Sequence, residues 1–104
     1  MPMIFHVTTA SDWLRQADAP VYEAPSLATE GFIHLSKAEQ LAGVLERFYQ
    51  NVPGLLLLHV DPARLTSELK YEVATHDDLF PHLYGPLNKS AVVRVEQLPA
   101  APIS

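Results

Sequence analysis

The chain has 104 residues, of which 48% are hydrophobic and 18% charged, and this length and composition are typical of one globular domain with a single core. Twelve acidic residues against seven basic ones give a net charge of −5, and no two basic residues are adjacent, so binding to nucleic acid is disfavoured. The absence of cysteine excludes disulfides and thiolate chemistry. The sequence has neither a long apolar run nor a signal-like N-terminus, so we expect a cytoplasmic protein without a membrane span.

The first predicted elements are a strand and a short helix. The segment Ile4–Thr8 is short, apolar and rich in residues that favour strands. Thr9 and Asp12 have the spacing of a capping box, which predicts that a helix begins there. Pro20 and Pro25 bracket a stretch that we interpret as a loop.

A second strand and a longer helix follow in the middle of the chain. Phe32–Leu35 has the composition of a strand, and Ser36 and Glu39 form a second capping-box pattern. The next apolar residues recur with the period of an amphipathic helix, and they are Leu41, Val44, Leu45 and Phe48.

The second half of the chain is predicted to be mostly β-structure. Leu55–Val60 is apolar on both faces, as expected of a central strand, and Leu69–Val73 and Ala91–Glu96 are further strands. A loose tail is expected from about Pro99. The order of elements favours an α+β fold in one domain over residues 1–104, because strict alternation of strands and helices does not continue.

The segment Phe80–Leu87 combines aromatic residues with two prolines and a glycine, so we expect an ordered loop rather than a strand. Ordered loops often carry functional residues. His82, Tyr84 and Gly85 are therefore candidate ligand-binding residues.

Five histidines raise the question of chemistry near neutral pH. Metal binding is disfavoured, because no short zinc-type ligand spacing occurs. His6 and His34 are the best candidates, since each lies in a strand segment just before a predicted helix, and helix N-termini attract anions. A purely structural role for each remains open, and Thr8 and Ser36 are either helix caps or site residues.

The segments Ile4–Thr8, Gly31–Ser36 and Phe80–Leu87 together resemble the bacterial family called domain of unknown function 952. That family is similar in turn to the ADP-ribosyltransferase fold, including the tRNA 2′-phosphotransferases, in which a split β-sheet with flanking helices holds NAD in a cleft. The resemblance implies that His6 and His34 hydrogen-bond ribose hydroxyls and that the backbone near Val7 meets the nicotinamide amide.

The departures from that pattern define two hypotheses. The late-strand catalytic glutamate of many transferases has Glu72 as its candidate here, although the surrounding motif differs, and Glu30 stands where the phosphotransferases have an arginine. A phosphorylated RNA substrate is therefore disfavoured. The first hypothesis is a domain that binds NAD or a related nucleotide and transfers or hydrolyses its glycosidic bond, with His6, His34 and Glu72 catalytic. The alternative is a non-enzymatic module for ligand sensing or protein interaction.

Overall fold

The computed structural model describes residues 2–99, so the end of the predicted tail lies outside the described residues. The predicted α+β class is confirmed, with three small antiparallel sheets in the order β1–β4–β8, β3–β6–β5 and β2–β7. The strands are β1 (Ile4–Thr9), β2 (Val21–Tyr22), β3 (Ile33–His34), β4 (Leu55–Val60), β5 (Glu68–Val73), β6 (Leu79–Tyr84), β7 (Leu87–Asn88) and β8 (Val92–Gln97). The α-helices are α1 (Ala10–Arg15), α2 (Pro25–Glu30) and α3 (Leu41–Phe48).

The first sheet has β4 at its centre, as its apolar sequence predicted. Ile4 of β1 is paired with Val60 of β4 and Thr9 with Leu55, so the two strands align over their full length. Leu58 is completely buried, because one face of β4 packs into the main core and the other toward α3. This sheet therefore contributes residues to both hydrophobic clusters of the core.

The second sheet overturns the prediction of a loop over Phe80–Leu87. Most of that segment is β6, the central strand between β3 and β5. Pro81 is tolerated there because its carbonyl accepts a hydrogen bond from the Leu35 backbone N–H at 3.0 Å, while its side chain is fully buried. A proline lacks the N–H group of a ladder residue but retains its acceptor, so it weakens a strand without forbidding it.

The segment between Pro20 and Glu30 is also more regular than predicted. It contains β2, which is paired with β7, and then helix α2. Pro25 is in the first turn of α2, where the missing N–H has no helical partner to lose. Gly31 ends the helix with φ 88°, a left-handed conformation that glycine adopts without strain.

The helix starts are predicted correctly at one position and wrongly at the other. Thr9 is the N-cap of α1, and its Oγ1 accepts a hydrogen bond from the Asp12 N–H at 3.1 Å. Ser36 is not a cap, because the turn leading into α3 starts one residue later. There the side chain of Gln40 accepts a hydrogen bond from the Lys37 N–H at 2.8 Å.

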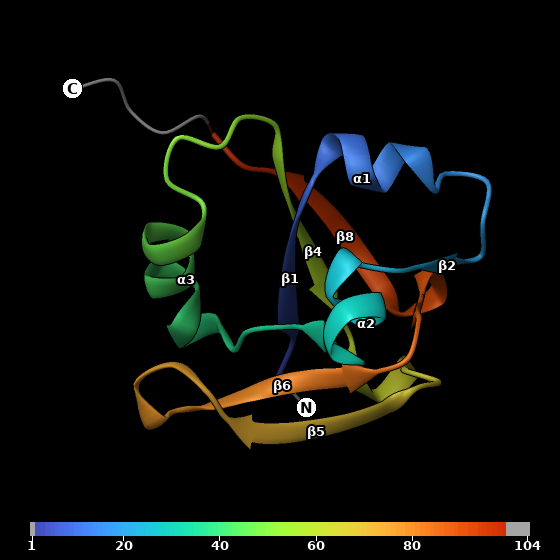
Figure 1. Ribbon diagram of the computed structural model, residues 1–104. Coiled ribbons are helices and arrows are strands. Elements are labelled where there is room, and N and C mark those ends of the chain that lie inside the picture. The colour runs from blue at the N-terminus through green and yellow to red at the C-terminus, as the bar shows by residue number, and fades with distance from the viewer. Residues whose placement is uncertain (1, 100–104) are drawn as a thin grey trace.

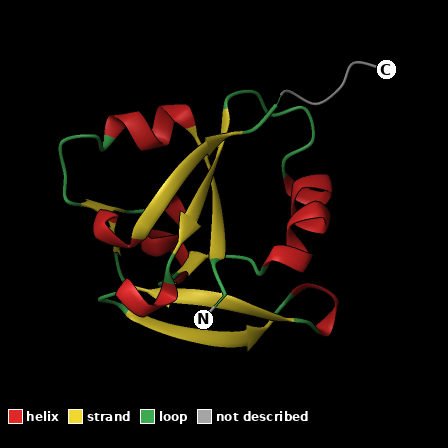
Figure 2. Ribbon diagram, turned by 180° about the vertical axis from the view of Figure 1, so that it is seen from behind, coloured by secondary structure: helices red, strands yellow, loops and turns green. Residues whose placement is uncertain are grey.

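The two larger sheets meet where β1 passes the residues that follow β3. Phe5 and Ser36 exchange backbone hydrogen bonds of 2.9 and 2.7 Å, which join the sheets. Figure 1 shows β5 and β6 running across the end of the first sheet, with α3 beside it, and Figure 2 shows the same arrangement from behind. In residues 2–99 no helix has the length and apolar character needed to cross a membrane.

Candidate functional site

A cavity of about 340 Å³ lies between α3, β1 and the second sheet. Its walls are mainly apolar, and the polar side chains in them are His34, Ser36, Tyr49 and His82. None of the lining residues in the described part of the chain is an acid, a lysine or an arginine. The full set of lining residues is Val7, His34, Leu35, Ser36, Val44, Phe48, Tyr49, Ala74, Phe80 and His82.

The alternation of side chains along β1 decides which of its residues reach this cavity. Val7 lies in the wall and packs with Leu55 and Leu57 beneath α3. Its neighbours His6 and Thr8 point to the opposite face of the strand, where both contact Tyr22. The resemblance implies that His6 and His34 both contact the ligand, but only His34 lines the cavity, since the ring of His6 is not part of its wall.

Both ring nitrogens of His6 have partners inside the protein. Nδ1 is 2.7 Å from the His34 carbonyl, which only accepts, so Nδ1 carries the proton. Nε2 is then the acceptor for the Tyr22 hydroxyl at 3.1 Å, and Thr8 in turn donates to the Tyr22 oxygen at 2.7 Å. Burial lowers the pKa of His6 to about 4, which keeps this chain of hydrogen bonds neutral near pH 7.

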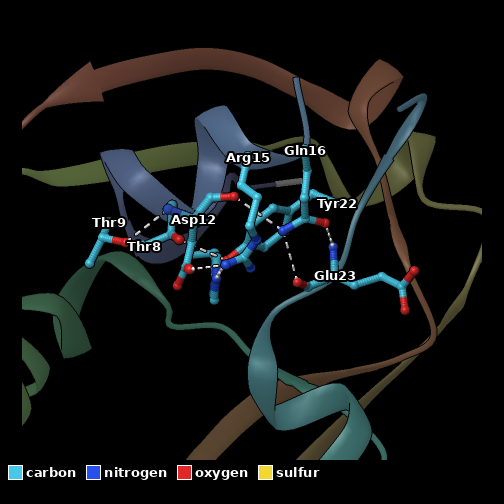
Figure 3. A network of polar contacts seen from close by, with 8 residues as sticks. Thr8, Thr9, Asp12, Arg15, Gln16, Tyr22 and Glu23 are labelled. Carbon is cyan, nitrogen blue, oxygen red and sulfur yellow. Dashed lines mark hydrogen bonds and ion pairs between the residues drawn. The ribbon is translucent and has the colours of Figure 1, made fainter. Parts of the chain in front are cut away.

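The tyrosine of this network is held by the segment that follows α1. The Gln16 side chain accepts a hydrogen bond from the Glu23 N–H at 2.8 Å and donates to the Glu23 carbonyl at 3.1 Å. Figure 3 shows the contacts between Gln16 and Glu23, with Tyr22 and Thr8 in the same view. These contacts fix the backbone next to Tyr22. Thr8 is hydrogen-bonded to the Tyr22 hydroxyl and does not line the cavity.

Glu72 is hydrogen-bonded to His82 and Tyr84, and not to His6 or His34, with which it was predicted to act. Its Oε1 accepts hydrogen bonds from the Tyr84 hydroxyl at 2.6 Å and from His82 Nδ1 at 2.8 Å. The hydrogen bond from Tyr84, followed by that from His82, lowers the pKa of the Glu72 carboxyl. An ionised carboxylate therefore holds His82 with Nδ1 as the donor.

The other ring nitrogen of His82 is the unusual atom of the site. His82 is 5% exposed, and its Nε2 is buried without a hydrogen-bond partner among residues 2–99. Phe32 stacks on the His82 ring at a centroid distance of 4.1 Å, and His34 meets it edge to face at 5.3 Å. Buried polar groups are nearly always paired, so such an atom in a cavity wall is a candidate for ligand contact.

His34 has a different environment from His6. Its side chain is 52% exposed, and Nε2 lies 3.1 Å from Glu30, the last residue of α2. The structure thus brings His34 together with His82, which is its direct partner in the β3–β6 register.

The remaining predicted ligand residues divide between the wall and its support. Ser36 is buried in the cavity wall, whereas Tyr84 and Gly85 are not part of it. Gly85 has φ 153°, and a Cβ at this position would lie 2.5 Å from the Oγ of Ser67. The backbone conformation and this close approach explain why the residue is glycine. Sequence reasoning identified His82 but missed Phe80 and the wall residues of α3, because the spacing of Val44 and Phe48 placed them on the core face of the helix. No group of three metal-ligating side chains occurs in the described part of the chain.

Residues 7–95 match the family described as "Protein of unknown function (DUF952)". The chain belongs to this family. The match includes the cavity wall from Val7 to His82 and the supporting Glu72 and Tyr84. A search of curated proteins found no match.

Solved structures of another protein share the fold. The chain is similar to the crystal structure of CC0527 from Caulobacter crescentus, with a TM-score of 0.86 and 31% identity over 93% of this chain and 86% of that one. It is also similar to the solution NMR structure of CC0527, with a TM-score of 0.80 and 31% identity over 94% of this chain and 85% of that one. CC0527 therefore has the same fold as this chain, although about two thirds of the aligned residues differ.

Proposed function

We propose that the cavity binds one ring-bearing end of NAD or a related nucleotide. The observation that carries this proposal is the composition of the wall, in which aromatic and aliphatic side chains surround a few neutral polar groups. Ligand sites typically combine apolar walls with a small number of polar atoms that fix orientation. A planar ring with one or two polar substituents matches such a wall.

The size and charge of the cavity favour a part of the nucleotide over the whole. Its volume of about 340 Å³ is near the lower end of the range for ligand sites, roughly 300–1,000 Å³. With no charged side chain in the described wall, a buried phosphate would lose its hydration without a compensating partner. The proposal therefore places the ring inside the cavity and the phosphates at its mouth.

The likeness to ADP-ribosyltransferases supports the choice of ligand. The segments Ile4–Thr8 and Gly31–Ser36, on which this resemblance depends, contribute Val7, His34 and Ser36 to one wall of the cavity. The two larger antiparallel sheets, with helices beside them, are compatible with a split β-structure. In this proposal His34 and Ser36 contact the ligand directly. His6 supports them from behind through its hydrogen bond to the His34 carbonyl.

A ligand-sensing role is favoured over glycosyl transfer by the position of Glu72. Its carboxylate already accepts hydrogen bonds from Tyr84 and His82, and it is not a wall residue. A transferase of the proposed kind needs an acid near the ribose carbon to stabilise positive charge. We therefore propose binding without turnover, and nicotinamide release from NAD is the result that would restore the enzymatic hypothesis.

An NMR titration of the protein with NAD and with ADP-ribose tests the proposal. Amide shifts confined to the wall, including Val7, Ser36 and Ala74, are expected. Ala74→Phe should weaken binding by filling the cavity from an exposed position, whereas Ala63→Phe, also exposed but outside the wall, should leave it unchanged. Shifts scattered over the surface, or equal binding by both variants, would contradict the proposal.

A further inference from the structure

The hydrogen bonds around Glu72 fix the chemical character of His82. Because Glu72 Oε1 is an acceptor for both Tyr84 and His82, the His82 proton is on Nδ1 and the ring is oriented by that bond. In the neutral imidazole Nε2 is then a lone-pair acceptor.

We propose that His82 Nε2 is the specificity-determining contact of the cavity and accepts a hydrogen bond from an N–H or O–H group on a neutral planar ring. This inference rests on the proposed function of the cavity as a ligand site, and it names the substituent that the site selects. An ester or ether in place of the donor would leave Nε2 unpaired and would face it with a second lone pair.

Access to Nε2 depends on the rings packed around it. Phe32 is stacked on His82, whereas His34 meets it only at an edge and is half exposed. The His34 side chain is held by an exposed pair with Glu30 and by an edge contact with Phe32 at 4.9 Å, and an exposed ion pair contributes little free energy. His34 is therefore the neighbour that turns aside when the donor group of the ligand reaches Nε2.

The test compares two neutral probes that share a phenyl ring and a carbonyl group: benzamide, whose NH2 group is a donor, and methyl benzoate, whose OCH3 group is not. With protein labelled at the histidine nitrogens, we expect an unprotonated Nε2 signal for His82 that shifts on addition of benzamide. Benzamide should bind about tenfold more tightly than the ester, the effect of one good hydrogen bond. Equal binding of the two probes, no binding of either, or a protonated Nε2 in the free protein would overturn the inference.

A variant separates Nε2 from the rest of the histidine. His82→Asn keeps an N–H donor toward Glu72 but has no counterpart of Nε2, so it should bind both probes at the level of the ester. Its thermal melt reports whether it is folded, and the comparison of probes on the unaltered protein decides the matter if it is not. A preference for benzamide that survives in folded His82→Asn contradicts the inference.

The outcomes for this inference and for the proposed function are distinguishable. If NAD and ADP-ribose fail to bind while benzamide shifts the His82 signal, the nucleotide is wrong and the role of His82 stands. If NAD binds equally to the unaltered protein and to His82→Asn, the nucleotide stands and the role of His82 is wrong.

Discussion

The Nδ1 atom of His6 lies 2.7 Å from the backbone carbonyl oxygen of His34, so the first histidine of the chain holds the strand that carries the second. Together with the two backbone hydrogen bonds between Phe5 and Ser36, this bond joins the two larger sheets. The two histidines therefore have unlike roles, one in the interior and one at the cavity.

Alanine substitutions should separate these roles. His6→Ala removes the donor to the His34 carbonyl and the acceptor for the Tyr22 O–H, which then keeps only Thr8 as a partner, so we expect a loss of about 1–3 kcal/mol in the free energy of unfolding. His34→Ala removes an exposed side chain and should change it by less than about 0.5 kcal/mol. Urea titrations of both variants measure the difference. Equal losses would contradict the assignment.

The stability of the fold should fall in mild acid because of His6. Its pKa is about 4 in the folded protein and 6.5 in the unfolded chain, so between these values the unfolded chain binds more protons. The contribution is fully present above pH 6.5 and declines as pH falls toward 4, with a total loss of about 3 kcal/mol. Urea titrations from pH 7.5 to 4 measure the slope.

His6→Asn is the control for this pH dependence, because it keeps a donor toward the His34 carbonyl and does not titrate. Its stability profile should be flatter over the same range. The lowered pKa values of Glu72 and Asp78 also remove stability in acid, but they act in both proteins and cancel in the comparison. Parallel profiles would show that His6 is not the group responsible.

Core packing at the first sheet predicts a larger effect from an apolar residue. Leu57 is 7% exposed and packs in the cluster between β4 and α3, so Leu57→Ala should cost about 2–5 kcal/mol. Leu14 is 66% exposed on α1, and Leu14→Ala is the matched control with little expected change. Thermal melts compare the two. A small loss at Leu57 would mean that this cluster contributes little to the core.

We also expect no measurable binding of tRNA at physiological salt. The chain carries a net charge of −5, and its basic residues are isolated from one another in the sequence. Affinity for nucleic acid depends mainly on several cations that neutralise phosphates together. A filter-binding assay checks this, and a complex of micromolar affinity would contradict it.

Local sequence patterns were sufficient for the first sheet and for the helices that flank it. The apolar run of β4, the cap at Thr9 and the period of α3 each reflect short-range rules, and all three are seen in the structure. The strand β6 was not predictable in this way. Its proline and aromatic residues favour a loop by local rules, and the neighbours β3 and β5 that stabilise it are distant in sequence.

The sequence predicted several residues of the cavity wall but not the orientation of the side chains. His34, Ser36, Val7 and His82 do lie in one wall, whereas His6 and Thr8 point away because of the alternation along β1. Which face of β1 meets the cavity depends on where α3 and Tyr22 pack, and no local pattern contains that information. The link between Glu72 and His82 likewise depends on the pairing of β5 with β6.

The pairing of β1 has a consequence for the order in which the chain assembles. During synthesis Ile4–Thr9 is made well before Leu55–Val60, the strand with which it pairs over its full length, and β4 pairs in turn with Val92–Gln97. Bringing such distant segments together has an entropic cost before their contacts form, and folds built this way typically take about milliseconds to seconds. A nascent chain ending before Leu55 therefore contains β1 without its main partner, and this strand is among the later ones to be fixed in place.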